Sequence, residues 1–217
     1  MGRRIAIVGN GSFAASDANS IERCDLVVRF NDCRSIGRGG LRTDVVAVCN
    51  TGRPARAMVC DPYWRNHVAV ASASSLWSVR DSSKFAELKL QLAEQDASLK
   101  DFCDDYTDEF AAFAAETAKA FSVIPRRHHD ELDRRLRELG TPSYIVPSSG
   151  LVAISFVIDS MAFADDSVVL AGFDHQGWPG HPFDAERVLV EQYIDEGRLS
   201  RLGVPPLVRG QSKLERA

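Results

Sequence analysis

The sequence predicts one α/β domain, with a mostly parallel β-sheet flanked by helices. Short runs rich in Val and Ile alternate with segments of helical periodicity, and strands that alternate with helices form parallel sheets covered on both faces. The chain contains no internal repeat, low-complexity tract or long linker. Its 217 residues are enough to bury one large core. We therefore expect a single domain over residues 1–217.

The first third of the chain supplies most of the expected strands. Three short apolar runs have the β-branched composition of buried parallel strands, and a polar stretch between the first two can hold a short crossover helix. A fourth run is also expected to be a strand. The expected strands are residues 4–8, 26–30, 45–49 and 67–71, and the expected helix lies within 12–24.

The remainder is expected to be mainly helical. Ala, Leu and Phe recur with helical spacing in two segments, and a charged amphipathic helix follows them. Two further helices come after it, each preceded by a short strand. The expected helices are residues 84–102, 108–121, 130–139, 151–163 and 185–197, the strands are 144–146 and 168–172, and irregular chain follows residue 198.

The composition excludes several classes of protein. A net charge of −4 argues against nucleic-acid binding, which requires a clustered basic surface. No apolar run approaches the 18 residues of a membrane-spanning helix. The cysteines are widely spaced and form no CxxC pair, so the sequence predicts a reducing, cytoplasmic location and no zinc site.

Asparagines follow three successive expected strands. The segment Gly9-Asn10-Gly11-Ser12 follows the first, Asn31 the second, and Asn50-Thr51 the third. Because ligands of parallel α/β sheets bind beyond the carboxyl ends of the strands, these amides can meet around one pocket. An amide is both a donor and an acceptor, which suits a nucleotide. The alternative is that Asn is simply a common turn residue.

A fourth group of polar residues, Ser148-Ser149-Gly150, begins an expected helix. One serine can cap the helix, and the free backbone N–H groups there can bind a phosphate. Both roles can hold at once.

The segment 172–186 is rich in Gly, Trp and His, as functional loops often are. His181 precedes an expected helix, whose dipole favours the neutral imidazole that a general base needs. Glu186 can orient that imidazole or reach a sugar hydroxyl.

Together these motifs resemble those of the sialyltransferases, glycosyltransferase family 29. Val8-Gly9-Asn10-Gly11 with Arg29-Phe30-Asn31 and Arg42-Thr43-Asp44 resembles the long sialyl motif, and Pro147–Leu151 through Gly172-Phe173 resembles the short motif. His181 and Glu186 match the His-x4-Glu motif. The GNG segment and Asn31 are also similar to the bacterial sialyltransferases of family 42. The motifs lie in residues 1–72 and 143–197, and 83–140 is expected to be a helical insertion.

The resemblance implies a Rossmann-like, GT-A-like fold and an inverting glycosyltransferase that needs no metal and no cofactor. It implies transfer of sialic acid, or of a related ulosonic acid such as Kdo, from a CMP-sugar to a glycan or glycolipid acceptor. The implied catalytic residues are His181, Glu186 and His175. The implied nucleotide-sugar-binding residues are Gly9, Asn10, Gly11, Ser12, Asn31, Asn50, Thr51, Ser148, Ser149 and Gly150.

We expect the chain to lack both the Golgi anchor and the motif-linking disulfide of animal sialyltransferases, since Ile5 stands where one of the two cysteines would be. We therefore expect a bacterial enzyme of polysaccharide biosynthesis, cytoplasmic and able to contact the inner face of the membrane peripherally. Two alternatives remain open. One is a catalytically silent nucleotide-binding or accessory protein on the same fold. The other is a Rossmann-type NAD(P)-binding enzyme, although no GxGxxG is present.

Overall fold

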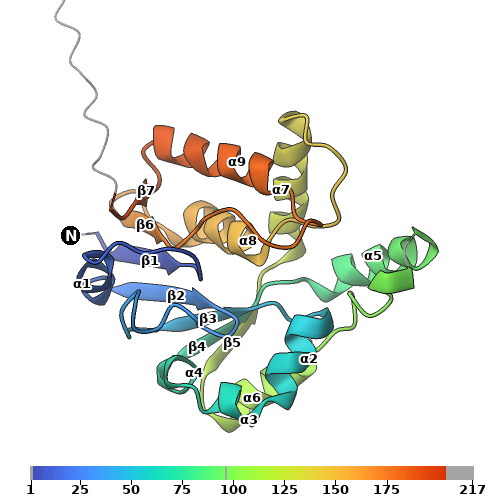
Figure 1. The fold of residues 1–217 in the computed structure, drawn as a ribbon, viewed down its shortest axis with the longest axis horizontal. Helices are drawn as coiled ribbons and strands as arrows, with labels where there is room; N and C mark the ends of the chain where they lie inside the picture. The colour runs from blue at the N-terminus through green and yellow to red at the C-terminus, as the bar shows by residue number, and fades with distance from the viewer. Residues whose placement is uncertain (1, 96, 204–217) are drawn as a thin grey trace, which may run out of the picture.

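The computed structural model describes residues 2–95 and 97–203 and confirms the predicted α/β fold. One seven-stranded sheet, in which every pairing is parallel, has the order β5-β4-β3-β2-β1-β6-β7 (Figure 1). From β1 the chain builds outward to β5 on one side, and then places β6 and β7 on the other side. The strands are β1 (Arg4–Val8), β2 (Leu26–Phe30), β3 (Val45–Val48), β4 (Ser75–Ser78), β5 (Ala120–Val123), β6 (Ser167–Ala171) and β7 (Ser200–Arg201).

Helices cover both faces of the sheet (Figure 1). On one face lie α7 (Arg126–Glu138), α8 (Ser149–Phe156) with the π-helical turn η2 (Val157–Met161), and α9 (Phe183–Asp195). The other face is covered by α1 (Asp17–Glu22), α2 (Gly52–Cys60), α3 (Pro62–Arg65), α4 (Val68–Ser72) and α6 (Thr107–Glu116).

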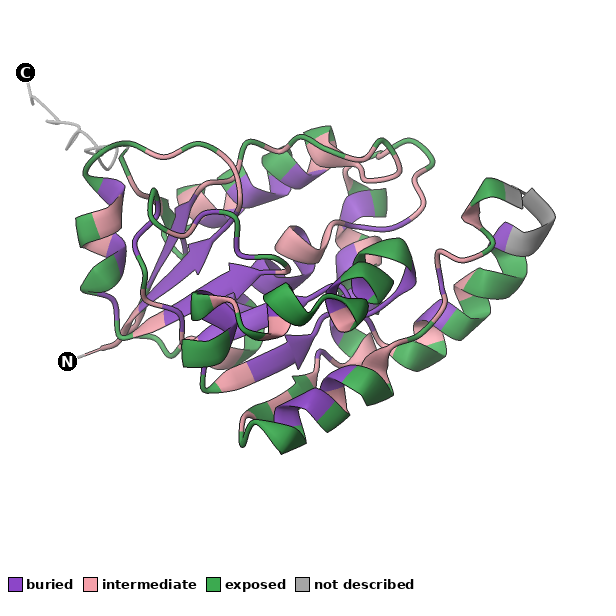
Figure 2. Cartoon of the chain, turned by 60° about the horizontal axis from the view of Figure 1, so that its bottom comes forward, coloured by how far each residue is buried: buried purple, intermediate pink, exposed green. Residues whose placement is uncertain are grey.

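Side chains of β1 alternate between the two faces, as the twofold period of a strand requires. Ile5 and Ile7 of β1 join the core under α8 and α9, whereas Ala6 and Val8 pack with Ile21 of α1. Buried residues make up most of β1, β2, β3, β4 and β6 and the sheet-facing sides of the helices (Figure 2). Because β1 has a core on both faces, its carboxyl end is a firmly held platform for a site.

The pair formed by α5 (Ser82–Gln95) and the 3-10 turn η1 (Ala97–Leu99) projects from the sheet (Figure 1). It has its own small core, in which Phe85 and Leu92 pack with Cys103 and Val146. This core also contacts Trp178, so the projecting pair borders the loop that follows β6.

Two of the expected strands were wrong. Residues 67–71 form most of α4, where the His67 side chain accepts a hydrogen bond from the Ala69 N–H (3.3 Å) and caps the helix. A five-residue apolar run does not distinguish a strand from a buried helical turn. Residues 144–146 belong to no strand, because the N–H groups of Ile145 and Val146 both donate to the Gly180 carbonyl (3.0 and 3.4 Å).

Three strands were missed, namely β4, which follows the run at 67–71 that was expected to be the fourth strand, β5 and β7. The helix expected over 108–121 ends at Glu116, and Ala118 has a positive φ of 53° that turns the chain into β5. The range 83–140 therefore supplies an edge strand as well as helices. The strand β7 lies in the region expected to be irregular, and residues 204–217 of that region lie outside the described residues.

Candidate functional site

The topology places the candidate site at the point where the strand order reverses, between β1 and β6. Such switch points leave a crevice at the carboxyl ends of the strands. Here Gly9 and Gly11 donate backbone hydrogen bonds to the carbonyls of Ala171 (2.9 Å) and Gly172 (2.8 Å). A Cβ on Gly9 would lie 2.2 Å from the Gly172 carbonyl oxygen. Gly9 is therefore needed for the close approach of two chain segments, not only for approach to a ligand.

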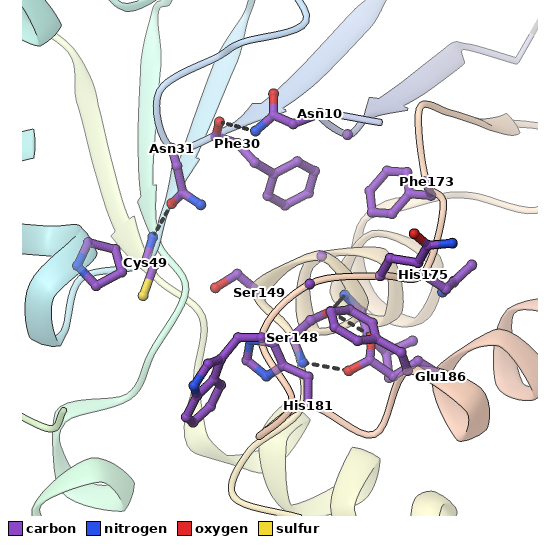
Figure 3. A pocket seen from close by; sticks show the side chains of 18 of the residues that line it. Asn10, Phe30, Asn31, Cys49, Ser148, Ser149, Phe173, His175, His181 and Glu186 are labelled. Atoms are coloured by element: carbon purple, nitrogen blue, oxygen red, sulfur yellow. Dashed lines mark hydrogen bonds between the residues drawn. The ribbon is translucent and has the colours of Figure 1, made fainter. Parts of the chain in front are cut away.

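A cavity of about 790 Å³ opens beyond these strand ends (Figure 3). That is within the range of ordinary small-molecule sites. Its walls come from the ends of β1 and β2, the starts of α2 and α8, the loop after β6 and the segment from η1 to Phe102. The expected binding and catalytic residues that line it are Gly9, Asn10, Gly11, Asn31, Ser148, Ser149, Gly150, His175, His181 and Glu186.

Asn31 follows β2 with a positive φ of 53°, a conformation that Asn tolerates better than most residues. Its Oδ1 accepts a hydrogen bond from the Cys49 N–H (2.8 Å), and its carbonyl accepts one from the Trp64 indole (2.9 Å). These contacts fix the residue from two directions. Figure 3 shows the amide nitrogen of Asn31 on the cavity side, where it can donate to a ligand.

Asn10 is held less completely. Its Nδ2 donates to the Phe30 carbonyl over 3.3 Å and to Asp32 over 3.4 Å. Its Oδ1 is buried and has no hydrogen-bond partner within the described part of the chain. A buried unpaired acceptor costs stability, and a ligand or water that donates to it would remove that cost.

Three expected binding residues lie away from the cavity. The Asn50 side chain accepts from the Arg80 N–H (2.7 Å) and donates to the Arg80 carbonyl (2.9 Å), joining the ends of β3 and β4. Thr51 accepts from the guanidinium of Arg80. Ser12 donates through its backbone and hydroxyl to Asp174, which secures the loop after β6. All three support residues that line the cavity.

Ser148 and Glu186 form one polar unit at the start of α8. Ser148 accepts a capping hydrogen bond from the Leu151 N–H (3.1 Å), as expected for an N-cap. Its own N–H and hydroxyl donate to the two oxygens of Glu186 (2.6 and 2.7 Å). Burial raises the pKa of Glu186, which is only 2% exposed, and the two bonds from Ser148 oppose that rise. Ser149 lines the cavity beside this unit, with its hydroxyl toward the open space (Figure 3).

Glu186 does not contact His181. The imidazole Nδ1–H of His181 donates to the Val146 carbonyl (2.9 Å), which leaves Nε2 without the proton in the neutral ring. Burial lowers the pKa of His181, and the nearby charge of Arg80 adds to this effect. The ring packs edge-on against Trp178 and Phe183, with centroids 5.0 and 5.4 Å away. The neutral form that we expected is thus favoured mainly by burial.

His175 also lies at the cavity, with a positive φ of 49°. Its Nε2 accepts a hydrogen bond from Arg201 of β7 (3.1 Å), and burial lowers its pKa. The contact ties the loop after β6 to the last strand of the sheet.

Sequence reasoning missed the contribution of the middle of the chain. Arg80, Arg53 and Phe102 line the cavity, and Phe102 stacks on Trp178 with ring centroids 5.0 Å apart. The available signal was that Arg80 closely follows an apolar run over residues 76–79. That signal was lost because the fourth strand was placed too early.

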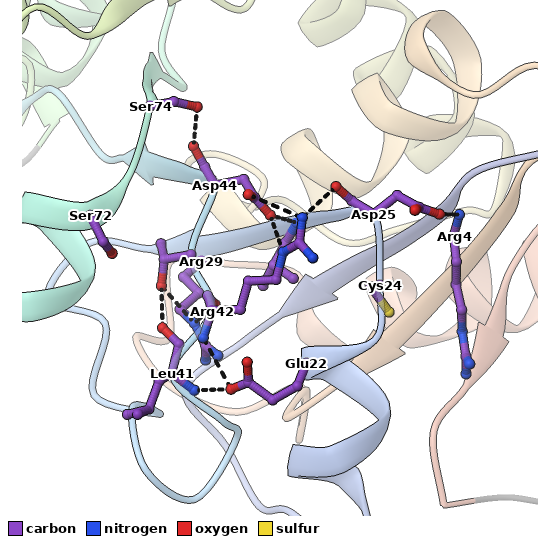
Figure 4. A network of polar contacts seen from close by, with 12 residues as sticks. Arg4, Glu22, Cys24, Asp25, Arg29, Leu41, Arg42, Asp44, Ser72 and Ser74 are labelled. Carbon is purple, nitrogen blue, oxygen red and sulfur yellow. Dashed lines mark hydrogen bonds and ion pairs between the residues drawn. The ribbon is translucent and has the colours of Figure 1, made fainter.

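The charged residues of the long motif hold the loop between β2 and β3 (Figure 4). Arg29 is fully buried, and its guanidinium donates to Ser35 and Thr43 and to the carbonyls of Gly39, Gly40 and Arg42. Arg42 pairs with Asp44, whose carboxylate also accepts from the Val27 N–H (2.7 Å). These residues position Asn31 and are absent from the cavity lining.

Among the described residues, no group of three or more His, Cys, Asp or Glu side chains could hold a metal ion. No helix within residues 2–95 and 97–203 has both the length and the apolar character needed to cross a membrane.

Comparison with solved structures defines the class of protein. Two crystal structures of a mammalian sialyltransferase, one in complex with Gal-beta-1-3GalNAc-ortho-nitrophenol, align with 92% of this chain. The alignments cover 69% and 68% of those chains, with TM-scores of 0.54 and 0.55 and identities of 15% and 17%. The chain is therefore an α/β protein with a sialyltransferase-like fold. No protein-family model matches it.

Sequence comparison then gives the family. The chain is 51% identical over 201 residues to the urease operon 23 kDa accessory protein of Rhizobium meliloti (strain 1021), covering 93% of each chain. The chain belongs to the family of this accessory protein.

This relationship corrects the function expected from the motifs. Sialyl transfer, a role in polysaccharide biosynthesis, and a CMP-sugar donor with a glycan acceptor as partners were wrong, because the close relative is an accessory protein and not a glycosyltransferase. At 15–17% identity the solved sialyltransferases share the fold alone, and a fold does not determine the chemistry of its site. The motifs persist here as elements of the scaffold, as the contacts of Arg29 and Glu186 illustrate.

Proposed function

We propose that this chain is a nucleotide-binding accessory protein of a urease operon, with no catalytic step of its own. The single observation that carries the proposal is the cavity at the switch point, in a chain that is 51% identical to a urease operon accessory protein. We also propose that the protein works in the cytoplasm, which is consistent with its five free cysteines.

The shape and chemistry of the cavity support a nucleotide. Aromatic rings from both sides, Phe30 with Phe173 and Phe102 with Trp178, offer flat apolar surfaces. The amide of Asn31 supplies a fixed donor, and the start of α8 supplies N–H groups suited to a phosphate. A few fixed polar groups in an aromatic cleft are typical of ligand sites.

The contacts of the expected catalytic pair support a role in binding rather than catalysis. Glu186 is occupied by Ser148, and His181 is anchored to the Val146 carbonyl without a carboxylate to orient it. Both residues therefore act in this proposal as supports of the cavity wall.

Thermal-shift measurements against CMP, CDP, UMP, UDP, GDP and NAD, with and without EDTA, test the proposal. A ligand that binds only the folded state stabilises it by about 2.7 kcal/mol at 100 times its Kd. For a chain of this size that corresponds to a rise in Tm of roughly 5–10 °C. We expect such a rise with at least one nucleotide and no effect of EDTA. The absence of any shift would contradict nucleotide binding, and a shift with NAD alone would favour the dinucleotide-binding alternative.

Asn31→Asp is the variant that isolates the site. The carboxylate can still accept from the Cys49 N–H, and Asp tolerates a positive φ. The donor facing the cavity is replaced by a negative charge that repels phosphate. We expect a Tm near that of the wild type but loss of the nucleotide-induced shift. Asn66→Asp, at an exposed residue whose amide donates to Pro62, is the matched control.

The accessory role has its own test. When the chain is co-expressed with a urease operon, omitting it should lower urease activity, and N31D should behave like the omission whereas N66D should not. Full urease activity with N31D would separate the accessory role from nucleotide binding.

A further inference from the structure

A second cavity adjoins the first. It has a volume of about 460 Å³ and lies between α5, α7 and the segment 141–147. Two residues, Arg80 and Ser149, line both cavities. They therefore form the wall shared by the two spaces, and the chemistry of Arg80 decides what that wall attracts.

Arg80 is held rigidly at this junction. Only 5% of its surface is exposed, and its backbone is fixed on both sides by the Asn50 amide. The guanidinium carbon lies 4.7 Å from the ring centroids of both Phe85 and Phe102. Two aromatic contacts orient the guanidinium plane while leaving its edge available for hydrogen bonds.

The charge of Arg80 has no counter-ion among the described side chains. The other two arginines of the larger cavity are ion-paired, Arg53 with Asp101 (2.8 Å) and Arg34 with Asp32 (3.0 Å). In the smaller cavity Lys84 is neutralised by Asp130 and Asp133 (2.8 and 2.6 Å). Arg80 makes no ion pair with any described residue, and the one hydrogen bond that its guanidinium makes to a described residue goes to the neutral hydroxyl of Thr51.

A guanidinium remains charged at all physiological pH values and offers five N–H donors. Burying such a charge without an anion is unfavourable. An anion that enters the junction can pair with this charge and accept hydrogen bonds from the free N–H donors. Phosphate and carboxylate groups match the planar fork of a guanidinium. The geometry therefore favours an oxyanion bound between the two cavities.

We propose that Arg80 is the receptor for an anionic group, a phosphate or carboxylate, bound where the two cavities meet. The anion is either the phosphate of the bound nucleotide or a separate small anion that occupies the smaller cavity. Only the first case rests on the proposed nucleotide-binding function.

Calorimetric titration of the full-length wild type, Arg80→Gln and Arg53→Gln with cytidine, CMP and inorganic pyrophosphate tests the proposal. If the nucleotide supplies the anion, the wild type prefers CMP to cytidine, and R80Q loses this preference by roughly 10- to 100-fold, as expected for a charge-assisted hydrogen bond. If a separate anion binds, pyrophosphate binding falls by the same factor in R80Q while the ratio of CMP to cytidine affinity stays unchanged. R53Q changes the ratio of CMP to cytidine affinity and the affinity for pyrophosphate much less than R80Q does, because Arg53 is already paired with Asp101.

The outcomes separate this inference from the proposed function. Pyrophosphate binding that is lost in R80Q, in a protein that binds neither CMP nor cytidine, supports the anion site and contradicts the nucleotide site for cytidine ligands. CMP binding of equal strength in the wild type and R80Q, with pyrophosphate binding also unchanged or absent, overturns the role of Arg80 and leaves the nucleotide proposal standing. Absence of binding by all three probes to the wild type overturns the anion site as well.

If R80Q does not fold, Arg80→Lys carries the test. A lysine keeps the charge but not the fork of donors, so anion affinity should fall by a smaller factor than that expected for R80Q. Affinities of R80K for CMP and pyrophosphate equal to those of the wild type would overturn the proposal.

Discussion

Replacing Ser148 with Ala should destabilise the fold through two lost contacts of one hydroxyl. That hydroxyl caps α8 by accepting from the Leu151 N–H (3.1 Å), and it donates to the buried carboxylate of Glu186 (2.7 Å). The backbone N–H of residue 148 continues to donate to Glu186, so the carboxylate keeps one of its two partners.

The magnitude follows from these contacts. Loss of an N-cap costs about 1 kcal/mol, and loss of a hydrogen bond to a charged group costs about 1.5–3 kcal/mol. Because both involve the same atom and need not add, we expect a total of about 2–4 kcal/mol. In a chain of this size each kcal/mol lowers Tm by roughly 2–4 °C, which gives a fall of about 4–16 °C.

Thermal unfolding followed by circular dichroism measures this fall, with Ser149→Ala as the control. Ser149 stands next in the chain and lines the cavity, and its hydroxyl makes no hydrogen bond within the described residues. S149A should keep its Tm within about 2 °C, since surface changes seldom exceed 0.5 kcal/mol, and should weaken nucleotide binding instead. Equal Tm values for S148A and the wild type would refute the assignment of Ser148 as a structural cap.

Two further predictions concern the scaffold around the site. Arg29→Lys leaves at least two of the five acceptors around that guanidinium without a donor, so urea unfolding should show a loss of about 2–5 kcal/mol, and an unchanged unfolding midpoint would contradict the network. Burial lowers the pKa of His129 to about 4 from the ordinary histidine value of about 6.5, so the unfolded state binds a proton first as the pH falls. Wild-type stability should therefore drop by up to about 3 kcal/mol between pH 6.5 and pH 4. His129→Gln, whose amide can still donate to the Val79 carbonyl, should lose much of that dependence, and an identical pH profile would show that His129 is not buried in the neutral form.

The sequence allowed the fold class to be predicted because the strands near the centre of the sheet are short, apolar and separated by turn residues. Residues 4–8 and 26–30 coincide with β1 and β2. The edge of the sheet was harder to recognise. In β5, half-buried residues alternate with exposed Ala120 and Ser122, and Ala and Phe suit a helix equally well.

Part of the candidate site could be predicted because parallel strands bring their carboxyl ends to one edge. That rule correctly brought Asn10, Asn31 and Ser149 to one cavity. It could not show that Asn50 turns away to bind the backbone of Arg80. It also could not show that the segment after η1 brings Phe102 against Trp178 at the cavity, since such packing depends on contacts between distant segments.

The function was misjudged for a related reason. Motifs such as Ser148 with Glu186 and Arg29 with the loop at 39–43 stabilise this fold through internal hydrogen bonds. A protein can therefore retain them without retaining the chemistry of a sialyltransferase. The presence of these motifs indicates the fold of the chain. The 51% identity to an accessory protein is the evidence that relates to its function.

The most direct test of the nucleotide site is a titration followed through the side-chain amide resonances of asparagine in ¹⁵N-labelled protein. Asn31 is assigned through N31D, and exposed Asn66 serves as the internal reference. With a nucleotide that raises Tm, the account predicts that the Asn31 amide shifts in proportion to occupancy while the Asn66 amide stays in place. Saturation by that nucleotide with no change at Asn31 would place the ligand elsewhere and contradict the account.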